Sequence, residues 1–343
     1  MLINSFQKDK RGIYVYEKGG YWSNLEKEEN QKLLSEAKRS STLSAVRKIC
    51  PNYEEVIFSP KRWGSLGLLE LTGKETCTDL GCMWGALTIP LARQCKHVIG
   101  VDQTYDSLVF LQKRAQDEKL DNIDLLCGKL NDLPHFGKMS DLILINGVLE
   151  WIPDAHDISL KSFIGKRKKA VTSNDPEKEQ GKFIKKCFLN LNERGKLLLA
   201  IENRFDLEHF FGKPDPHVFL NHITYMPRWY ANIRSKQKLG RNYVNYLYSF
   251  KQIEKKLKSS GFRSVKLYAC WPDYRFADRI VPIGCDSISE LDHLRDVTIN
   301  ELMIKLLVNG NRGGTLQSII RKLVFKTFLG YWFAPSIIAI AQK

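Results

Sequence analysis

The chain has 343 residues, a net charge of +15 and eight cysteines. It is long enough to bury a full core. The cysteines form no C-x-x-C pair, which argues against a zinc site or a disulfide framework, and we expect reduced, buried thiols. The N-terminus alternates charged and aromatic residues without a long apolar run, so no secretory signal and a cytoplasmic protein are predicted.

The predicted elements begin with an N-terminal cap, which comprises a hairpin around Glu17 to Gly20 and two helices, NLEKEENQKLLSEAKR and STLSAVRKI. From Thr76 onward, short apolar runs alternate with segments of helical period. Their order is TCTDLG, ALTIPLARQC, HVIGVDQ, YDSLVFLQKRAQDEKL, IDLLCG, DLILINGVLEW, FIKKCFLNLNERG (a helix ending at Gly195) and KLLLAIEN. This alternation predicts an α/β fold, with a mostly parallel sheet covered by helices on both faces.

The alternation stops after Asn203, where residues 204–246 are aromatic, basic and irregular. It resumes with a helix, SFKQIEKKLKSSGF, and a strand, SVKLYACWP, followed by a helical insertion, ISELDHLRDVTINELMIKLLV, and a last strand, SIIAIAQK. The apolar stretch over residues 323–341 is interrupted by a lysine and a proline, which favours a buried strand over a membrane span.

The excess of positive charge lies in two segments. Residues 161–186 hold nine basic and three acidic residues, and residues 228–263 hold ten basic and one acidic, so their excesses together equal the net charge. Such local basicity indicates an anionic partner, such as a diphosphate, a lipid headgroup surface or a nucleic acid. Solvated helix faces are the alternative.

The loop TDLGCMWG follows the first strand of the predicted sheet, where a doubly wound sheet binds its ligand. A dinucleotide fingerprint G-x-G-x-x-G starting at Gly81 requires glycine where Met83 and Ala86 stand, so two of its three glycines are absent. The pattern D-x-G-x-G-x-G is met by Asp79, Gly81 and Gly85, with only its middle glycine replaced, by Met83.

In this loop the sequence resembles class I S-adenosylmethionine-dependent methyltransferases. The resemblance implies a Rossmann-like, doubly wound sheet of seven mostly parallel strands, and S-adenosylmethionine as cofactor. In that family a carboxylate at the end of the second strand binds both ribose hydroxyls, and Asp102 stands there. The full set of residues implied to contact the cofactor is Asp79, Gly81, Cys82, Met83, Gly85, Asp102, Gln103, Lys129, Leu130, Asn146 and Gly147.

Many members of the family bind the adenine amino group with an aspartate after the third strand. Lys129 occupies that place, and lysine cannot accept a hydrogen bond. Either the backbone around Lys129 and Leu130 contacts adenine alone, or Asp132 substitutes for the missing carboxylate.

The segment IENRFDLEHFFGKPDPHVF, residues 201–219, resembles a branch of these enzymes encoded among bacterial surface-polysaccharide genes, as do SPKRWGSLGLLEL, YSFKQIEKKLKSSGF and WPDYRF. The branch implies O-methylation of a sugar hydroxyl in a surface glycan, a lipid-linked glycan or a nucleotide sugar. It also implies an anionic or glycan acceptor, and association with a glycosyltransferase or a membrane surface.

Two other functions remain open. The charge alone suggests an RNA methyltransferase, although no NPPY-like motif follows the fourth strand, where NGVLEW stands, and nucleic acid is the less favoured partner. A non-catalytic S-adenosylmethionine-fold module, which binds a partner or a membrane surface through its basic segments, is the second alternative.

A hydroxyl acceptor must lose a proton, and a base with a pKa near the working pH is favoured, for which histidine is best suited. His217 is the first candidate, with Asp215 able to orient it, while His209, His222 and Glu202 remain alternatives. No metal is predicted. The residues expected to contact the acceptor are Glu150, Trp151, Asn203, Arg204, Tyr225, Arg228 and Trp229, although those from Asn203 onward could instead brace or pack their segment.

The predicted organisation is one sheet domain interrupted by insertions. Its units are a cap (1–65), a cofactor-binding core (66–203), an acceptor-binding insertion (204–246), a core helix with the sixth strand (247–285), a helical insertion (286–325) and the final strand (326–343).

Overall fold

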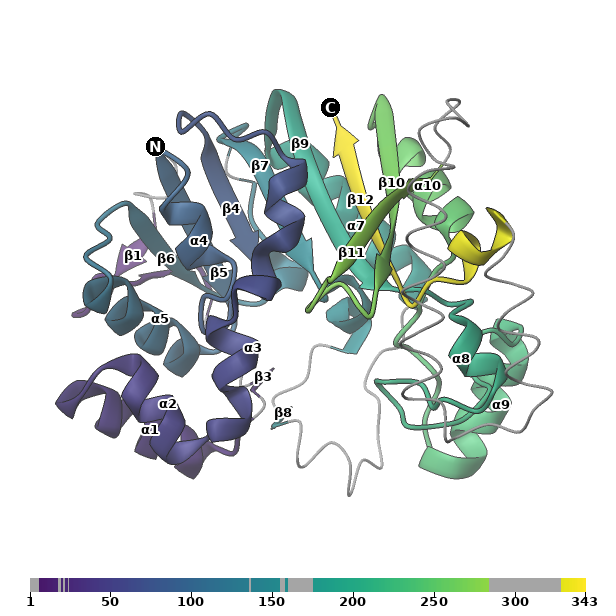
Figure 1. Ribbon diagram of the computed structural model, residues 1–343, viewed down its shortest axis with the longest axis horizontal. Helices are drawn as coiled ribbons and strands as arrows, with labels where there is room; N and C mark the ends of the chain where they lie inside the picture. Colours follow the sequence, from purple (N-terminus) through teal and green to yellow (C-terminus); the bar gives the residue numbers. More distant parts are fainter. Residues whose placement is uncertain are drawn as a thin grey trace.

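The structure, a computed structural model, describes residues 6–17, 20, 22–23, 25–135, 137–154, 158–159, 175–283 and 328–343. A ten-stranded sheet in the order β1-β2-β6-β5-β4-β7-β9-β12-β10-β11 runs through the molecule (Figure 1). Its strands are β1 (Gln7–Lys8), β2 (Tyr14–Val15), β4 (Thr76–Leu80), β5 (His97–Asp102), β6 (Ile123–Cys127), β7 (Ser140–Asn146), β9 (Leu191–Glu202), β10 (Ser264–Trp271), β11 (Arg279–Ile283) and β12 (Ser336–Gln342). A separate parallel pair joins β3 (Trp22–Ser23) to β8 (Ile158–Ser159).

Seven neighbouring strands, in the spatial order β6-β5-β4-β7-β9-β12-β10, form the predicted Rossmann-like sheet. Strands β6, β5, β4, β7 and β9 run parallel, and β12 is inserted antiparallel between β9 and β10. The mostly parallel α/β fold is therefore confirmed. The sequence did not predict the outer strands: β1 and β2 extend one edge, and β11 pairs antiparallel with β10 at the other.

The predicted helices appear in order with somewhat shorter bounds, and three further helices are present among the described residues. The helices are α1 (Lys27–Arg39), α2 (Thr42–Ile49), α3 (Glu54–Phe58), α4 (Thr88–Ala92), α5 (Tyr105–Asp117), α7 (Pro176–Asn190), α8 (Leu207–Phe210), α9 (Arg228–Leu239) and α10 (Phe250–Ser259), with 3-10 turns η2 (Pro51–Tyr53), η3 (Pro60–Leu68), η4 (Leu130–Asp132), η5 (Leu149–Asp154) and η6 (Phe328–Phe333). Local sequence sets their starts. Ser41 caps α2, and Ser249 with Gln252 forms a capping box on α10. The three further helices are α3, α8 and α9. The last two lie within residues 204–246, so the expectation of an irregular segment was wrong there.

Helices cover both faces of the sheet. Successive side chains along a strand point to opposite faces, and the side chains on both faces are buried. On β7, Ile143 and Ile145 pack into the cluster that contains α7 and α10, while Leu142 and Leu144 pack into the cluster that contains η3 and α4. The seven cysteines in the described residues are free and buried, as expected. The apolar C-terminal stretch ends in β12, whose residues from Ser336 to Ala341 are buried.

Two predicted elements are wrong. The chain turns back between β1 and β2 at Asp9 to Gly12, where Asp9 Oδ1 accepts the Arg11 and Ile13 N–H groups; the strand after Gly20 pairs with β8 instead of forming a hairpin. The helix predicted to end at Gly195 stops at Asn190, because the following polar residues join β9 through an irregular register against β7.

Figure 1 shows two helical groups at the edge of the sheet where the parallel strands end. The cap helices α1 to α3 lie on one side, and α8 and α9 of the insertion after β9 lie on the other. The second helical insertion predicted at 286–325 falls outside the described residues. Within the described part, no helix is long and apolar enough to cross a membrane.

Candidate active site

A pocket lies at the carboxyl ends of β4, β5 and β7, between these strands and the cap. It is lined by the predicted cofactor residues Asp79, Gly81, Cys82, Met83, Asp102, Gln103, Leu130, Asn146 and Gly147, and by Trp151 from the predicted acceptor set. The sheet therefore brings together side chains that the sequence placed after four separate strands.

Asp102 ends β5 with its carboxylate fixed by two backbone groups. Met83 N donates to Oδ2 at 2.9 Å, and Thr104 N donates to Oδ1 at 2.8 Å. Burial raises the pKa of Asp102 to about 6 in spite of these two hydrogen bonds. Its remaining lone pairs face the pocket and could accept ligand hydroxyl groups.

At Met83, which stands where the sequence pattern has its middle glycine, the loop backbone adopts a conformation typical of glycine. Met83 has φ +42°, in the left-handed region, and this geometry points its N–H at Asp102. Gly81 has φ +76°, and a Cβ there would lie 2.5 Å from Val148 Cγ2. At Gly147, with φ +68°, a Cβ would meet the Tyr274 hydroxyl. Close approach to the pocket therefore requires glycine at both positions.

Two predicted cofactor residues lie elsewhere. A Cβ at Gly85 would meet Leu111, so this glycine serves packing against α5 and does not line the pocket. Lys129 Nζ lies 3.9 Å from Glu17 Oε1, and its carbonyl accepts a 2.5 Å hydrogen bond from the Tyr16 hydroxyl. Its charged side chain is thus drawn to the N-terminal segment.

Leu130 and Asn131 line the pocket beside that lysine, while Asp132 does not. The Asn131 Oδ1 atom is buried without a hydrogen-bond partner in the described part of the chain. An amide oxygen can accept from an amino group, which lysine cannot do. Asn131 is therefore the side chain best placed for the contact expected at Lys129, and the sequence analysis missed it.

Arg62 is the second residue that the sequence analysis missed. It belongs to η3, within the quoted segment SPKRWG, and lines the pocket together with Asp79. Its Nε and Nη1 atoms are buried and have no hydrogen-bond partner among the described residues, and burial lowers the pKa of Arg62. A buried guanidinium in this state suits an anionic group of a ligand, such as a carboxylate.

Asp79 stands at the end of β4 with one oxygen already engaged. Thr88 Oγ1 donates to Asp79 Oδ2 at 2.6 Å. Burial raises the pKa of Asp79 to about 6, and the hydrogen bond from Thr88 and the charge of Arg62 oppose this rise. Arg62 and Asp79 therefore present opposite charges to one end of the pocket.

Beside the pocket, three side chains from distant segments meet. Glu150 comes from η5 after β7, Glu202 from the end of β9, and His217 from the insertion. His217 Nε2 lies 3.7 Å from Glu150 Oε1 and 3.8 Å from Glu202 Oε2. Trp151, which lines the pocket, packs edge-on against His217 with ring centroids 4.8 Å apart. The cluster thus adjoins the wall of the pocket.

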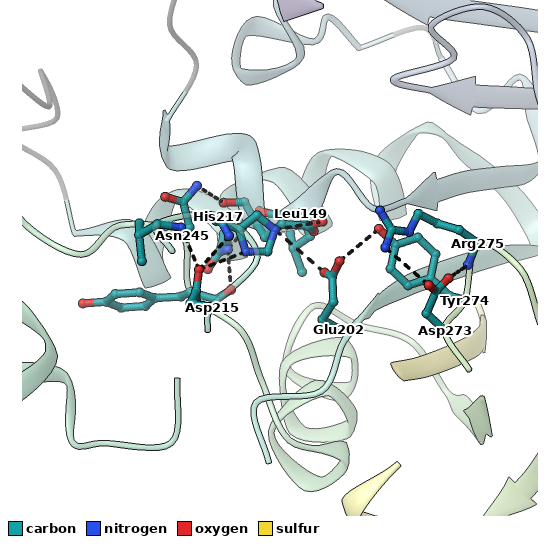
Figure 2. Close-up of polar contacts among 12 residues, drawn as sticks. Leu149, Glu202, Asp215, His217, Asn245, Asp273, Tyr274 and Arg275 are labelled. Carbon is teal, nitrogen blue, oxygen red and sulfur yellow. Dashed lines mark hydrogen bonds and ion pairs between the residues drawn. The ribbon is translucent and has the colours of Figure 1, made fainter. Parts of the chain in front are cut away.

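Asp215 lies next to His217, and its role in orienting the imidazole stays a prediction, because His217 Nδ1 has no hydrogen-bond partner among the described residues. His217 Nδ1 lies 3.5 Å from Asp215 Oδ1 (Figure 2). That oxygen also accepts the N–H groups of His217 and Val218, at 2.7 and 2.9 Å, and Tyr243 Oη donates to Oδ2 at 2.8 Å. The carboxylate is therefore held rigidly behind the imidazole.

Glu150 and His217 both bind a proton more tightly than such groups usually do. Burial would lower the pKa of His217, but the carboxylates of Asp215, Glu150 and Glu202 outweigh burial and raise it well above the usual value. Burial, and then the charge of Glu202, raise the pKa of Glu150 to about 7. Because Glu150 and His217 lie close together, they exchange protons as a coupled pair, and proton acceptance belongs to the cluster as a whole.

The alternative histidines take structural positions. His209 is buried, with Nδ1 3.0 Å from the Lys213 carbonyl oxygen. His222 is exposed and pairs with the Tyr225 hydroxyl. Of the candidate bases, His217 and Glu202 are the ones that meet at the cluster.

Several residues predicted to contact the acceptor brace the insertion instead. Asn203 Nδ2 donates to the carbonyls of Trp332 and Ala334, at 2.9 and 2.8 Å. Arg204 donates to carbonyls of residues 224–226, and Arg228 donates to the carbonyl of residue 247. The bracing alternative therefore fits these three side chains, whereas Trp229 stands 66% exposed on α9.

Tyr274 is a further residue that the sequence reasoning did not single out. It lies in the segment WPDYRF after β10, and its hydroxyl donates to Glu202 Oε1 at 3.4 Å (Figure 2). The same hydroxyl faces Gly147 of the pocket. Tyr274 therefore links the cluster to the pocket wall.

Residues 78–164 match the family model of a methyltransferase domain. This range holds the glycine-rich loop, Asp102 and the loop after β7 that ends in Glu150. Together with the strand order, the match shows that the chain carries a methyltransferase domain with the class I fold, and S-adenosylmethionine is the cofactor of this type of enzyme.

Particular relatives are similar over parts of the chain. An uncharacterized RNA methyltransferase of Synechocystis is 32% identical over 79 residues, which make up 23% of this chain and 17% of that protein. An uncharacterized methyltransferase of Schizosaccharomyces pombe is 26% identical over 200 residues, or 54% of this chain and 72% of that protein. The structure of a Haemonchus contortus phosphoethanolamine N-methyltransferase is similar at a TM-score of 0.45 and 13% identity, covering 91% of this chain and 60% of that one. This chain thus spans about a sixth of the length of its cyanobacterial relative.

Proposed function

We propose that the protein methylates a sugar hydroxyl in a surface glycan, a lipid-linked glycan or a nucleotide sugar, with S-adenosylmethionine as methyl donor. The observation that carries this proposal is the cluster of buried Glu150, partly buried Glu202 and buried His217 beside the cofactor pocket. A hydroxyl is a weak nucleophile until it loses its proton, and this cluster supplies proton-accepting atoms next to the pocket.

The residues of the pocket fit the cofactor. Asp102 would accept the ribose hydroxyls, Arg62 would bind the methionine carboxylate, and Asn131 would accept from the adenine amino group. Gly81 and Gly147 leave the close backbone approach that a Cβ would fill. When bound, S-adenosylmethionine supplies an electrophilic methyl group on a sulfonium.

The protein residues then have to position the acceptor and take its proton. Trp151 lies between the pocket and His217, so its ring marks where an acceptor would meet the cofactor. Positioning a reactant in this way can supply several kcal/mol of the barrier reduction. Proton transfer to a placed base adds about 10²- to 10⁴-fold.

A sugar is favoured over other hydroxyl acceptors by the aromatic surface of the insertion. Trp229 is 66%, Phe219 46% and Phe210 40% exposed, and Phe210 stacks on Tyr225 with centroids 4.4 Å apart. Flat apolar rings suit the faces of sugar rings. The resemblance of residues 201–219 to the surface-polysaccharide branch supports the same acceptor class.

Methyl transfer is tested by incubating the full chain with methyl-labelled S-adenosylmethionine and, in separate reactions, surface glycan, lipid-linked glycan, nucleotide sugars and total RNA. We expect label in one of the carbohydrate fractions and an O-methyl sugar in its mass spectrum. Comparison of surface glycans from cells with and without the gene should show the same sugar. Label confined to RNA would replace the proposed acceptor, and cofactor binding without label in any fraction would favour a non-catalytic module.

A further inference from the structure

The cluster of Glu150, Glu202 and His217 has the donors of a metal site, and its polar atoms lack other partners. Glu150 is fully buried, and neither of its carboxylate oxygens has a hydrogen-bond partner in the described part of the chain. Within the same described residues, Glu202 Oε2 has none either. Buried polar atoms are nearly always paired, so this group of vacant acceptors requires an explanation.

The spacing of the atoms is too wide for hydrogen bonds and close to that of metal ligands. One oxygen or nitrogen from each residue lies within 4.8 Å of the other two. The contacts of His217 Nε2 with the two glutamates, at 3.7 and 3.8 Å, exceed hydrogen-bond length. Ligands held about 2.1 Å from a tetrahedral ion are about 3.4 Å apart. The two contacts of His217 Nε2 would therefore shorten by a few tenths of an ångström, and the glutamate oxygens, which lie within 4.8 Å of each other, would move together by up to about 1.4 Å.

The charge of the cluster calls for a cation. Three carboxylates surround one imidazole: those of Glu150 and Asp215 are buried, and that of Glu202 is partly buried. Burying unpaired carboxylates is costly, and a single imidazolium leaves negative charge in excess. A divalent cation between the two glutamates and a neutral His217 would balance the charge more fully.

The surroundings of His217 match those of a metal-binding histidine. Such a residue typically donates its second ring N–H to a carboxylate, which fixes its tautomer and orientation. Asp215 Oδ1 lies 3.5 Å from Nδ1 without forming a hydrogen bond among the described residues, so this contact would shorten when His217 binds a metal. Asp215 is itself fixed by Tyr243 and two backbone groups. Nε2 is thereby turned toward the two glutamates.

We propose that Glu150, Glu202 and His217 bind a divalent transition-metal ion, Mn²⁺ or Zn²⁺, beside the cofactor pocket. One imidazole with two carboxylates favours these ions over Mg²⁺ and Ca²⁺, which prefer all-oxygen sites. Three protein ligands leave open positions. As far as it concerns turnover, the inference rests on the proposed methyl transfer: an acceptor hydroxyl bound at an open position would lose its proton more readily.

The test uses the full chain, stripped with a chelator and titrated with Mn²⁺, Zn²⁺ or Mg²⁺ by calorimetry, with electron paramagnetic resonance for Mn²⁺. We expect one equivalent of Mn²⁺ or Zn²⁺ to bind, and Mg²⁺ to bind more weakly. Glu150→Gln should weaken binding by at least tenfold. Glu193→Gln is the matched control: Glu193 lies on β9 with Glu202, but pairs with Lys138 and is 65% exposed.

Binding of S-adenosylhomocysteine verifies that each variant is folded. The inference is overturned if the wild-type chain binds this nucleoside but neither Mn²⁺ nor Zn²⁺, or if Glu150→Gln, still binding the nucleoside, keeps wild-type metal affinity. Methyl transfer at the full rate in metal-stripped protein would refute the role in turnover and leave the proposed function intact. Metal binding without methylation of any acceptor would refute the function and leave the metal site standing.

Discussion

The two sides of the active site are built in different ways. The cofactor side is assembled from residues at the carboxyl ends of strands: Asp79 in β4, Asp102 in β5 and Asn146 in β7. The other side joins Glu150, Glu202 and His217, whose approach depends on how the insertion after β9 folds back. The sheet alone therefore fixes the first side, whereas tertiary packing decides the second.

This difference predicts different consequences of mutation. Substitutions on the cofactor side should change the affinity for S-adenosylmethionine, and substitutions in the cluster should change turnover at unchanged affinity. Substitutions in the contacts that brace the insertion should lower stability without altering either property. The largest effect is expected at the cluster, because proton removal enters the chemical step itself.

Replacing His217 with alanine should reduce turnover by about 10²- to 10⁴-fold, because it removes the central member of the proton-accepting cluster. Labelled methyl transfer to the carbohydrate acceptor measures the effect. His209→Ala is the matched control, since His209 contacts a backbone carbonyl away from the cluster. Wild-type turnover in His217→Ala, together with intact cofactor affinity, would exclude His217 from the chemistry.

The comparison also explains what could be predicted from the sequence. Alternation of apolar runs and helices identifies the parallel sheet, and the resemblance carried by the glycine-rich loop indicates the cofactor side, because both are local patterns read along consecutive strands. Glu150 and Trp151, which follow the fourth strand, were expected to contact the acceptor. The meeting of His217 with Glu150 and Glu202 spans more than sixty residues, so no spacing could show it.

Arg62 and Asn131 were missed for a related reason. Their significance lies in being buried without partners at the pocket, which only the packing of η3 and η4 against the sheet reveals. Conversely, Asn203 and Arg204 follow β9 directly and suggested an acceptor site by position. Their hydrogen bonds to the carbonyls of residues 224, 226, 332 and 334 show that a polar residue at a strand end can also brace the chain.

On the cofactor side, Gly81→Ala should weaken S-adenosylmethionine binding by about tenfold to a hundredfold. The added Cβ would lie 2.5 Å from Val148 Cγ2 at a backbone φ of +76°, so both the loop and the pocket wall must shift. Calorimetry measures the change. Gly67→Ala is the control, because no atom lies within 4 Å of a Cβ there among the described residues. Equal affinities for the two variants would show that the loop tolerates a side chain at Gly81.

Asp102→Asn should weaken cofactor binding by about tenfold or more, since a hydrogen bond to a charged group contributes about 1.5 to 3 kcal/mol. The pKa of Asp102 is raised to about 6 by burial, so the carboxylate is ionised above this pH and protonated below it. Wild-type affinity should therefore fall as the pH drops from about 7 to about 5. Calorimetry at several pH values should show that the cofactor affinity of Asp102→Asn decreases less than that of the wild type over the same pH range.

The stability of the ligand-free protein should show the opposite trend at this residue. Because the pKa of Asp102 is higher in the folded chain than the usual aspartate value of 3.8, the folded state holds the proton more tightly. Its contribution to stability is then greatest at low pH and is lost as the pH rises from about 4 through about 6. Wild type should therefore lose stability relative to Asp102→Asn over this range, and parallel unfolding curves would contradict the raised pKa.

The smallest effect on catalysis is expected where the insertion is braced. Asn203→Ala removes hydrogen bonds to the Trp332 and Ala334 carbonyls and should lower the free energy of unfolding by about 1 to 3 kcal/mol, with an unchanged acceptor KM.

Trp229→Ala should do the reverse, because its side chain is 66% exposed: stability stays within about 0.5 kcal/mol while the acceptor KM rises. Denaturant unfolding and acceptor kinetics, measured on both variants, distinguish a residue that braces the chain from one that contacts the acceptor. If the acceptor KM rises in Asn203→Ala and not in Trp229→Ala, the acceptor binds at the end of β9 and not at α9.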